Sequence, residues 1–327
     1  MKLNTERIHT IWHLTWPQCI MLLCQFVIGI TDVWAGGRIG SEVQASIGLI
    51  TQCHMMFMAL AMAAVNGAVA SISQSLGACK FVRARRYVGL VTIGCIAVGS
   101  AIAVAASVWR EPLLRLIQTP ESIMPVAIMF LTATIWGIPG QYTLTIGAAV
   151  FRSAKMVLIP LYVTGTACLL NVFGDLAFGL GWWGFPAYGA AGLAYSTLIS
   201  VTVGAALMLF LLMRHGLFTR DSFPGWRWIK AGAPYLLKVA GPAFGTSFLW
   251  QTGYMVLYVI TASLPFGRVN ALAGLTTGLR VESILFLPAV AFSMTASVLV
   301  GHALGEGNRR EAKRTLLATL GIACAGM

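Results

Sequence analysis

The sequence predicts an all-α integral membrane protein, a polytopic bundle of helices, and three observations lead to that fold class. Hydrophobic residues make up 58% of the 327 residues and charged residues only 10%, whereas a soluble domain carries about 25% charged residues. The charges lie far apart, so that apolar runs of about 20 residues or more, enough to cross the hydrocarbon core, separate them. These runs lack the alternation of apolar and polar residues that an outer-membrane barrel strand requires.

Trimming the charge-free runs at Gly, Pro and interfacial Trp predicts eight membrane-spanning helices. They lie near residues 14–35, 46–76, 87–109, 122–148, 156–178, 187–213, 236–262 and 274–303. A ninth apolar run begins at Thr315. The first span has no small-residue cleavage site before charged sequence resumes, so we expect it to remain as a helix.

The basic residues predict the orientation of these spans. Of the 22 Lys and Arg residues, Arg280 lies inside a span and four lie on one side of the membrane, at positions 38, 110, 115 and 268. The other seventeen lie on the opposite side: Lys2, Arg7, Lys80, Arg83, Arg85, Arg86, Arg152, Lys155, Arg214, Arg220, Arg227, Lys230, Lys238, Arg309, Arg310, Lys313 and Arg314. We expect the protein to lie in the cytoplasmic (inner) membrane. The positive-inside rule then places its N-terminus in the cytoplasm. The net charge of +12 follows from topology, so we expect lipid and no nucleic acid as a partner.

An internal repeat predicts two lobes. The matching motifs are Pro17, Val43-x-Ala45-x-x-Gly48-Leu49, Leu76-Gly77 and Ala84-x-Arg86 in one copy, and Pro242, Val269-x-Ala271-x-x-Gly274-Leu275, Leu304-Gly305 and Ala312-x-Arg314 in the other. An offset of six spans preserves orientation, as in transporters that rock one half against the other. We expect a six-helix lobe at 1–213, a cytoplasmic linker at 214–235 and the start of a second lobe at 236–327. Twelve spans would need roughly 470 residues, so the second lobe is expected to be truncated.

Ionisable residues inside spans are candidates for function, because each costs about 2.5–3.5 kcal/mol on insertion scales. Asp32 and Asp175 lie at matched depth, roughly 27–28 Å along two helices that run outward. Asn171, four residues before Asp175, shares its face, and Thr197 lies roughly 15 Å below the outer surface on the returning helix. Two carboxylates, an amide and a hydroxyl are therefore expected to converge.

The chemistry of this group favours cation coupling. Oxygen ligands suit a hard cation such as Na⁺, and two carboxylates in a low-dielectric cavity repel each other, so that one can hold a proton. No catalytic residue, no structural metal and no organic cofactor is expected, and H⁺ or Na⁺ is the coupling ion. The alternative is that both Asp side chains reach the outer headgroups and that Thr197 serves helix packing.

Glu282 and Arg280 lie inside the eighth span. Residues two apart on a helix do not face each other, so they are not expected to form a simple ion pair. We assign them to substrate or cation handling, with pairing to another helix as the alternative for Glu282.

His302 is expected to be a hydrogen-bonded residue between helices. Trp182 and Trp183 are expected to be interfacial anchors.

The order of these motifs resembles the multidrug and toxic compound extrusion (MATE) family. The resemblance rests on Pro17, Asp32 and Gln74-Ser-Leu-Gly77, on Asn171-x-x-x-Asp175 with Gly189-Ala-Ala-Gly-Leu-Ala-Tyr-Ser-Thr197, and on Gly278-Leu-Arg-Val-Glu-Ser283 with Val300-Gly-His-Ala-Leu-Gly305. It implies a twelve-helix antiporter in two lobes. It also implies that Asp32, Asn171, Asp175 and Thr197 correspond to the family's cation-coupling cluster, and Glu282 to an acidic residue of the second lobe. The family's last helices are absent, and the loop at 182–186 is longer than usual.

The sequence thus predicts a cation-coupled (H⁺ or Na⁺) antiporter that exports small organic cations or drugs by alternating access, as a monomer if full length. One alternative is a lipid-linked precursor flippase of the same superfamily, which would need a strongly basic cavity, and only Arg280 lies within a span. Another is a truncated, inactive transporter that moves little substrate unless a partner supplies the remaining helices. An intramembrane enzyme is disfavoured because HExxH and GxSxG are absent from the sequence.

Overall fold

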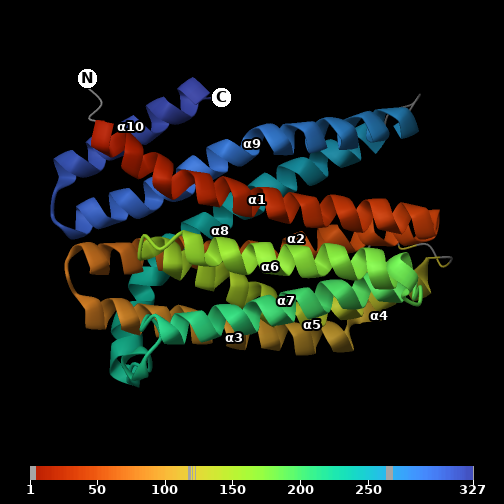
Figure 1. Cartoon of the computed structure of the whole chain (residues 1–327), viewed down its shortest axis with the longest axis horizontal. Helices are drawn as coiled ribbons and strands as arrows, with labels where there is room; N and C mark the ends of the chain where they lie inside the picture. The colour runs from red at the N-terminus through yellow and green to blue at the C-terminus, as the bar shows by residue number, and fades with distance from the viewer. Residues whose placement is uncertain (1–4, 117–118, 120, 122, 263–267, 327) are drawn as a thin grey trace.

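The computed structural model describes residues 5–116, 119, 121, 123–262 and 268–326, and these residues form long helices that run along one common direction (Figure 1). Within these ranges the structure describes only the backbone of residues 5, 255, 258–259, 261–262, 268–283, 285 and 325–326. The described residues contain helices and turns and no strand. The all-α fold class predicted from composition is therefore confirmed.

The described residues up to position 222 form seven helices and three short turns. The helices are α1 (Thr5–Ile39), α2 (Ser41–Gly77), α3 (Phe81–Val108), α4 (Arg110–Leu116), α5 (Met124–Ser153), α6 (Leu158–Gly174) and α7 (Ala190–Arg214). A π-helical turn, η1 (Asp175–Gly179), and a 3₁₀ turn, η2 (Trp182–Gly184), connect α6 to α7, and η3 (Arg220–Ser222) follows α7. The chain continues through α8 (Trp226–Ala262), α9 (Arg268–Gly305) and α10 (Arg309–Gly326).

The eight predicted spans all fall on helices. Seven helices in the described part of the chain are long and apolar enough to cross a membrane, and the seventh predicted span, at 236–262, is not among them. That span lies in α8, where Gly, Ser, Thr, Gln and Tyr interrupt the apolar sequence between Gly241 and Tyr254. The division into lobes at 213 and 236 remains a prediction.

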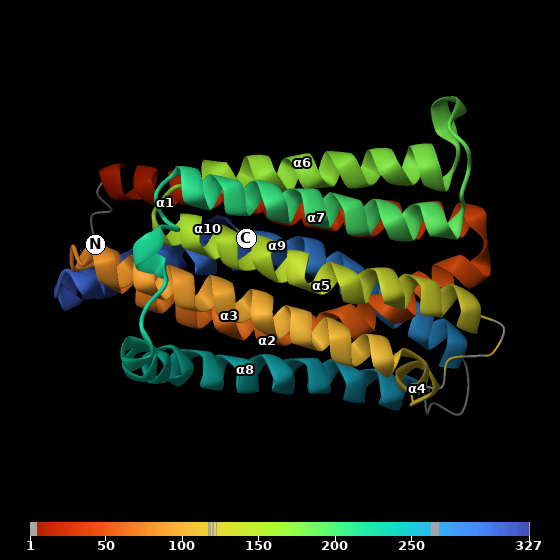
Figure 2. The same ribbon diagram turned by 90° about the horizontal axis from the view of Figure 1, so that it is seen from below.

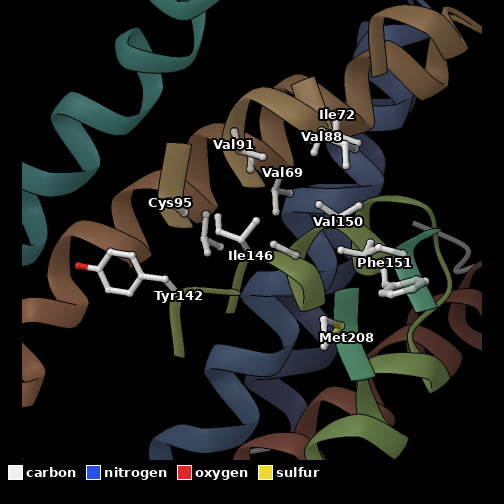
Figure 3. Packing of buried hydrophobic residues seen from close by; sticks show 14 of the residues in the cluster. Val69, Ile72, Val88, Val91, Cys95, Tyr142, Ile146, Val150, Phe151 and Met208 are labelled. Atoms are coloured by element: carbon white, nitrogen blue, oxygen red, sulfur yellow. The ribbon is translucent and has the colours of Figure 1, made fainter. Parts of the chain in front are cut away.

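Helix α5 forms the centre of the first seven helices, because it packs against α2, α3 and α7. Its buried side chains Tyr142, Ile146, Val150 and Phe151 meet Val69 and Ile72 of α2, Val88, Val91 and Cys95 of α3, and Met208 of α7 (Figure 3). Glycines allow close approach here, since a Cβ at Gly147 would collide with the side chain of Met208. The packing of small and large side chains replaces the hydrophobic driving force that is missing between helices in lipid.

Polar side chains inside the spans bond to their own helices. Ser46 donates to the carbonyl of Glu42 at 2.8 Å, and Thr51 donates to that of Ile47 at 2.7 Å. Ser71 and Thr143 make the same bond to the residue four positions earlier. These bonds satisfy hydroxyls that hydrocarbon cannot solvate, so Ser and Thr are tolerated without further partners.

The repeat-related motifs Leu76-Gly77 and Leu304-Gly305 meet where α2 crosses α9. A Cβ at Gly77 would collide with the carbonyl of His302, and one at Gly305 would collide with the carbonyl of Gln74. His302 also bonds through Nε2 to the carbonyl oxygen of Ser153 on α5 at 2.7 Å, which agrees with the expected hydrogen-bonded role. Toward the other end of the molecule the ribbons of α8 and α9 diverge from α1 and α2 (Figure 1). We call the contact of α2 with α9 at Gly77 and Gly305 the glycine crossing.

Candidate functional site

The two carboxylates predicted to converge do so between α1, α6 and α7. Asp32 of α1 lies close enough to Asp175 and Asn171 to interact with both side chains. Asn171 Nδ2 donates to Thr197 Oγ1 of α7 at 3.1 Å. Asp175 and Asn171 are fully buried, while Asp32 and Thr197 are partly buried. The structure therefore brings together all four residues that the sequence selected.

The local sequence explains why α6 and α7 come close enough to build this site. Helix α6 ends at Gly174, and Asp175 opens the π-helical turn η1. A Cβ at Gly174 would collide with the side chain of Ser196, and one at Gly192 would collide with the carbonyl of Phe178. Glycine at these two positions thus permits the contact, and π-helical turns within helices are frequent at functional sites.

Ser196 is a member of the site that the sequence analysis did not select. Its hydroxyl donates to Asp175 Oδ1, and the Ser196 side chain is buried. Ser196 lies next to Thr197, whose hydroxyl donates to the carbonyl of Leu193 at 3.1 Å. The adjacent hydroxyl residues Ser196 and Thr197 in an apolar helix were the sequence feature that could have indicated Ser196 as a site residue. Sequence alone, however, did not show that both side chains face α6. We call Asp32, Asn171, Asp175, Ser196 and Thr197 the carboxyl cluster.

The carboxyl cluster has more acceptors than donors. Asp32 Oδ1, Asn171 Oδ1 and Asp175 Oδ2 are buried and have no hydrogen-bond partner among the described residues. A buried acceptor without a donor is costly, and a buried uncompensated charge costs more. A proton or a small hard cation would satisfy these three oxygens, because carboxylate and amide oxygens are hard ligands. The roles of the individual residues stay predictions.

A second polar cluster, which the sequence analysis missed, joins α1 to α9. Thr15 Oγ1 and Gln18 Nε2 both lie 2.9 Å from Thr295 Oγ1 of α9. All three side chains are buried, and Gln18 Oε1 has no partner among the described residues. Thr15 and Gln18 are three residues apart, on one face of α1 beside Pro17. We call these three residues the neutral cluster.

Glu282 and Arg280 lie on α9, and their side chains are outside the described residues. Their assignment to substrate or cation handling stays a prediction. A surface groove of about 530 Å³ lies along α8 between Thr246 and Leu257.

A polytopic bundle of helices with a buried pair of carboxylates belongs to the class of membrane transport proteins, where intramembrane acids serve ion and substrate pathways. The family model described as MatE matches residues 17–176 and 242–326, which is more than half of the chain, and the chain belongs to this family. The two matched segments begin at Pro17 and Pro242, the prolines paired in the internal repeat. Members of the family are transporters and not enzymes, in agreement with the sequence prediction.

Relatives and solved structures agree with this assignment. The chain is 27% identical over 294 residues to the probable multidrug resistance protein NorM of Thermotoga maritima, covering 87% of this chain and 61% of that protein. It is 23% identical over 307 residues to the FAD transporter of Shewanella oneidensis, covering 93% and 67%. The chain thus spans less than two thirds of the length of the Thermotoga relative.

Two solved structures share the fold. The chain matches a MOP superfamily transporter from Pyrococcus furiosus with a TM-score of 0.86 and 20% identity, covering 96% of this chain and 68% of that one. It matches the Vibrio cholerae MATE transporter VcmN in its bent form with a TM-score of 0.81 and 21% identity, covering 97% and 70%. The protein is therefore a multi-pass helical membrane protein with the architecture of MATE transporters.

Proposed function

We propose that this protein is a cation-coupled antiporter that exports small organic cations in exchange for H⁺ or Na⁺. The observation that carries the proposal is the carboxyl cluster, in which two carboxylates share a buried site with unpartnered oxygens on Asp32, Asn171 and Asp175. A coupling ion bound there neutralises charge that the fold leaves uncompensated. The chain carries its own copy of this cluster and lies in the cytoplasmic membrane with its N-terminus inside. The full-length protein acts as a monomer.

The contact between α2 and α9, one helix from each repeat, supports alternating access. The glycine crossing holds α9 against α2 at one end, while the ribbons diverge toward the other (Figure 1). A change in the charge of the carboxyl cluster alters the position of α1, which contacts both α6 and α9. Two inter-helix arrangements with different ion affinity are the minimum that coupling requires.

The choice of organic cations rests on charge. The described part of the cluster is acidic, and an anionic substrate would meet repulsion there. The relatives include both a probable multidrug resistance protein and a FAD transporter. Binding assays must therefore include an anionic control.

The test is competition between coupling ion and substrate, measured on the purified chain. Antiport requires that Na⁺ or protons weaken the binding of an organic cation, and linkage makes the effect reciprocal. We expect ethidium affinity to fall several-fold as Na⁺ or acidity increases, and the response to disappear in Asp175→Asn but persist in Gln18→Leu. An ethidium affinity that changes with neither Na⁺ nor pH, or tighter binding of FAD than of ethidium, would overturn the proposal.

A further inference from the structure

The connection between α6 and α7 carries a continuous array of aromatic rings. Trp183 stacks on Phe173 of α6 with ring centroids 5.6 Å apart and an interplanar angle of 13°, and Trp182 meets Trp183 edge-on at 6.0 Å. Phe178 and Phe185 contact each other at 5.2 Å. Trp182 also contacts Trp34 near the end of α1 at 6.0 Å. We call residues 175–189 the aromatic loop.

The aromatic loop is a built structure, although its rings are exposed. The Tyr188 amide donates to the carbonyl of Phe178 at 2.8 Å, and the Phe185 amide donates to that of Trp182 at 3.3 Å. Trp183 has a φ of 58°, a left-handed conformation that is an outlier for a bulky residue. Nevertheless 64% of Trp183 and 61% of Tyr188 are exposed. Backbone strain that holds large rings outward points to a function for those rings.

The position of the aromatic loop identifies what its rings meet. Figure 2 shows the loop projecting sideways from the end of α6, on the side of the bundle opposite to α8 and so away from the space between the two repeats. It continues the exposed apolar face of α6 and α7, which includes Leu169 and Ile199. No charged residue occurs between positions 176 and 213. The loop therefore prolongs a lipid-facing surface, at the level where the spans end.

We propose that the aromatic loop is a lipid anchor, which inserts its rings into the boundary between phospholipid headgroups and acyl chains at this end of the bundle. Trp and Tyr prefer that boundary because each joins an apolar ring to a polar N–H or O–H group. The exposed Arg38 lies over Trp34, with its Cζ 4.7 Å from the ring centroid, and places a guanidinium at the margin of the array for a headgroup phosphate. Because the loop begins at Asp175, the anchor sets the depth of the carboxyl cluster in the bilayer. The proposal does not depend on the transported substrate or on the coupling ion.

The anchor is tested by tryptophan quenching in the full chain, reconstituted in phosphatidylcholine vesicles. Subtracting the emission of Trp183→Phe from that of the unmodified protein isolates Trp183. Trp109→Phe is the matched control, since Trp109 is also highly exposed, at 71%, but is followed by charged residues at 110 and 111. If Trp183→Phe fails to accumulate, Trp182→Phe isolates the neighbouring ring of the same array.

We expect lipids brominated near the headgroup to quench the isolated emission about twofold more than lipids brominated near the chain end, because an interfacial ring lies at headgroup depth. Aqueous iodide should quench it less than it quenches the Trp109 emission. Strong iodide quenching without bromolipid quenching would place the loop in water and overturn the proposal. Protection from both quenchers would also overturn it, since protein would then cover the loop.

Discussion

Helix α1 carries two buried polar clusters that differ in how well their groups are satisfied. The carboxyl cluster joins Asp32 to α6 and α7 and leaves three oxygens without partners among the described residues. The neutral cluster, about 21 Å lower at Gln18 by helical rise, joins α1 to α9 and leaves one oxygen unpartnered. The carboxyl cluster contains two carboxylates and no positively charged member, whereas the neutral cluster contains no charged side chain. One helix therefore combines a site suited to a cation with a fixed contact between repeats.

The largest effect is expected from a substitution that disrupts the carboxyl cluster. Asp175→Asn removes one charge and one hard ligand, so cation affinity should fall at least about tenfold, or ~1.4 kcal/mol. The thermal stability of the purified chain, measured with and without Na⁺ and across a pH series, should lose its ion dependence. Without ions the variant should be at least as stable as the parent, because an uncompensated buried charge is gone. A Na⁺ response equal to that of the unmodified protein would show that the ion binds elsewhere.

The next effect tests whether the contact with α9 is fixed by packing. Gly77→Val places a side chain against the carbonyl of His302 and should destabilise the protein by about 1–3 kcal/mol. Gly48→Val on the same helix is the matched control, since no atom of the described residues lies within 4 Å of a Cβ at Gly48. Thermal unfolding in detergent compares the two. Equal losses would mean that the β-branched residue, and not the crossing, is responsible.

A smaller effect is expected at the neutral cluster. Gln18→Leu removes one inter-helix hydrogen bond, whereas Thr295→Val removes two, those with Gln18 and Thr15. Such bonds average about 0.6 kcal/mol each in membrane proteins. The double variant should lose less than the sum of the two single losses, because both changes remove the same contact. Cation response should remain unchanged in all three variants. A lost response would show that the two clusters on α1 are coupled.

The smallest effect is expected at Ser196. Ser196→Ala removes the hydroxyl that donates to Asp175 but keeps both carboxylates, so cation affinity should change only a few-fold, by about 1 kcal/mol or less. Titration of Na⁺ against thermal stability measures the shift in its midpoint. A loss as large as that of Asp175→Asn would mean that Ser196 is itself required for ion binding.

Sequence reasoning located the carboxyl cluster because helical geometry is regular. Equal distances along two outward helices placed Asp32 and Asp175 at one depth, and the four-residue interval placed Asn171 on the same face. The all-α fold and seven of the eight predicted spans followed from composition and run length in the same way. These features depend on one helix at a time.

Features that depend on how helices are placed against each other were not predictable. Thr295 meets Gln18 only because α9 crosses α1, and the separation of 277 positions gives no local signal. Ser196 was overlooked in favour of Thr197, since neighbouring residues on a helix point in different directions. Both side chains reach α6 and the turn after it only because Gly174 and Gly192 allow the helices to approach closely. Trp183 combines a left-handed backbone with a stack on Phe173, and the loop sequence reveals neither feature.

The most direct test of the central claim is infrared difference spectroscopy of the carboxyl groups on adding Na⁺ or acid to the purified chain. We predict a carboxyl band that changes with one of these ions, disappears in both Asp32→Asn and Asp175→Asn, and persists in Gln18→Leu. The absence of any ion-dependent carboxyl band, or a band that survives in both Asp variants, would contradict the assignment of this cluster as the coupling-ion site.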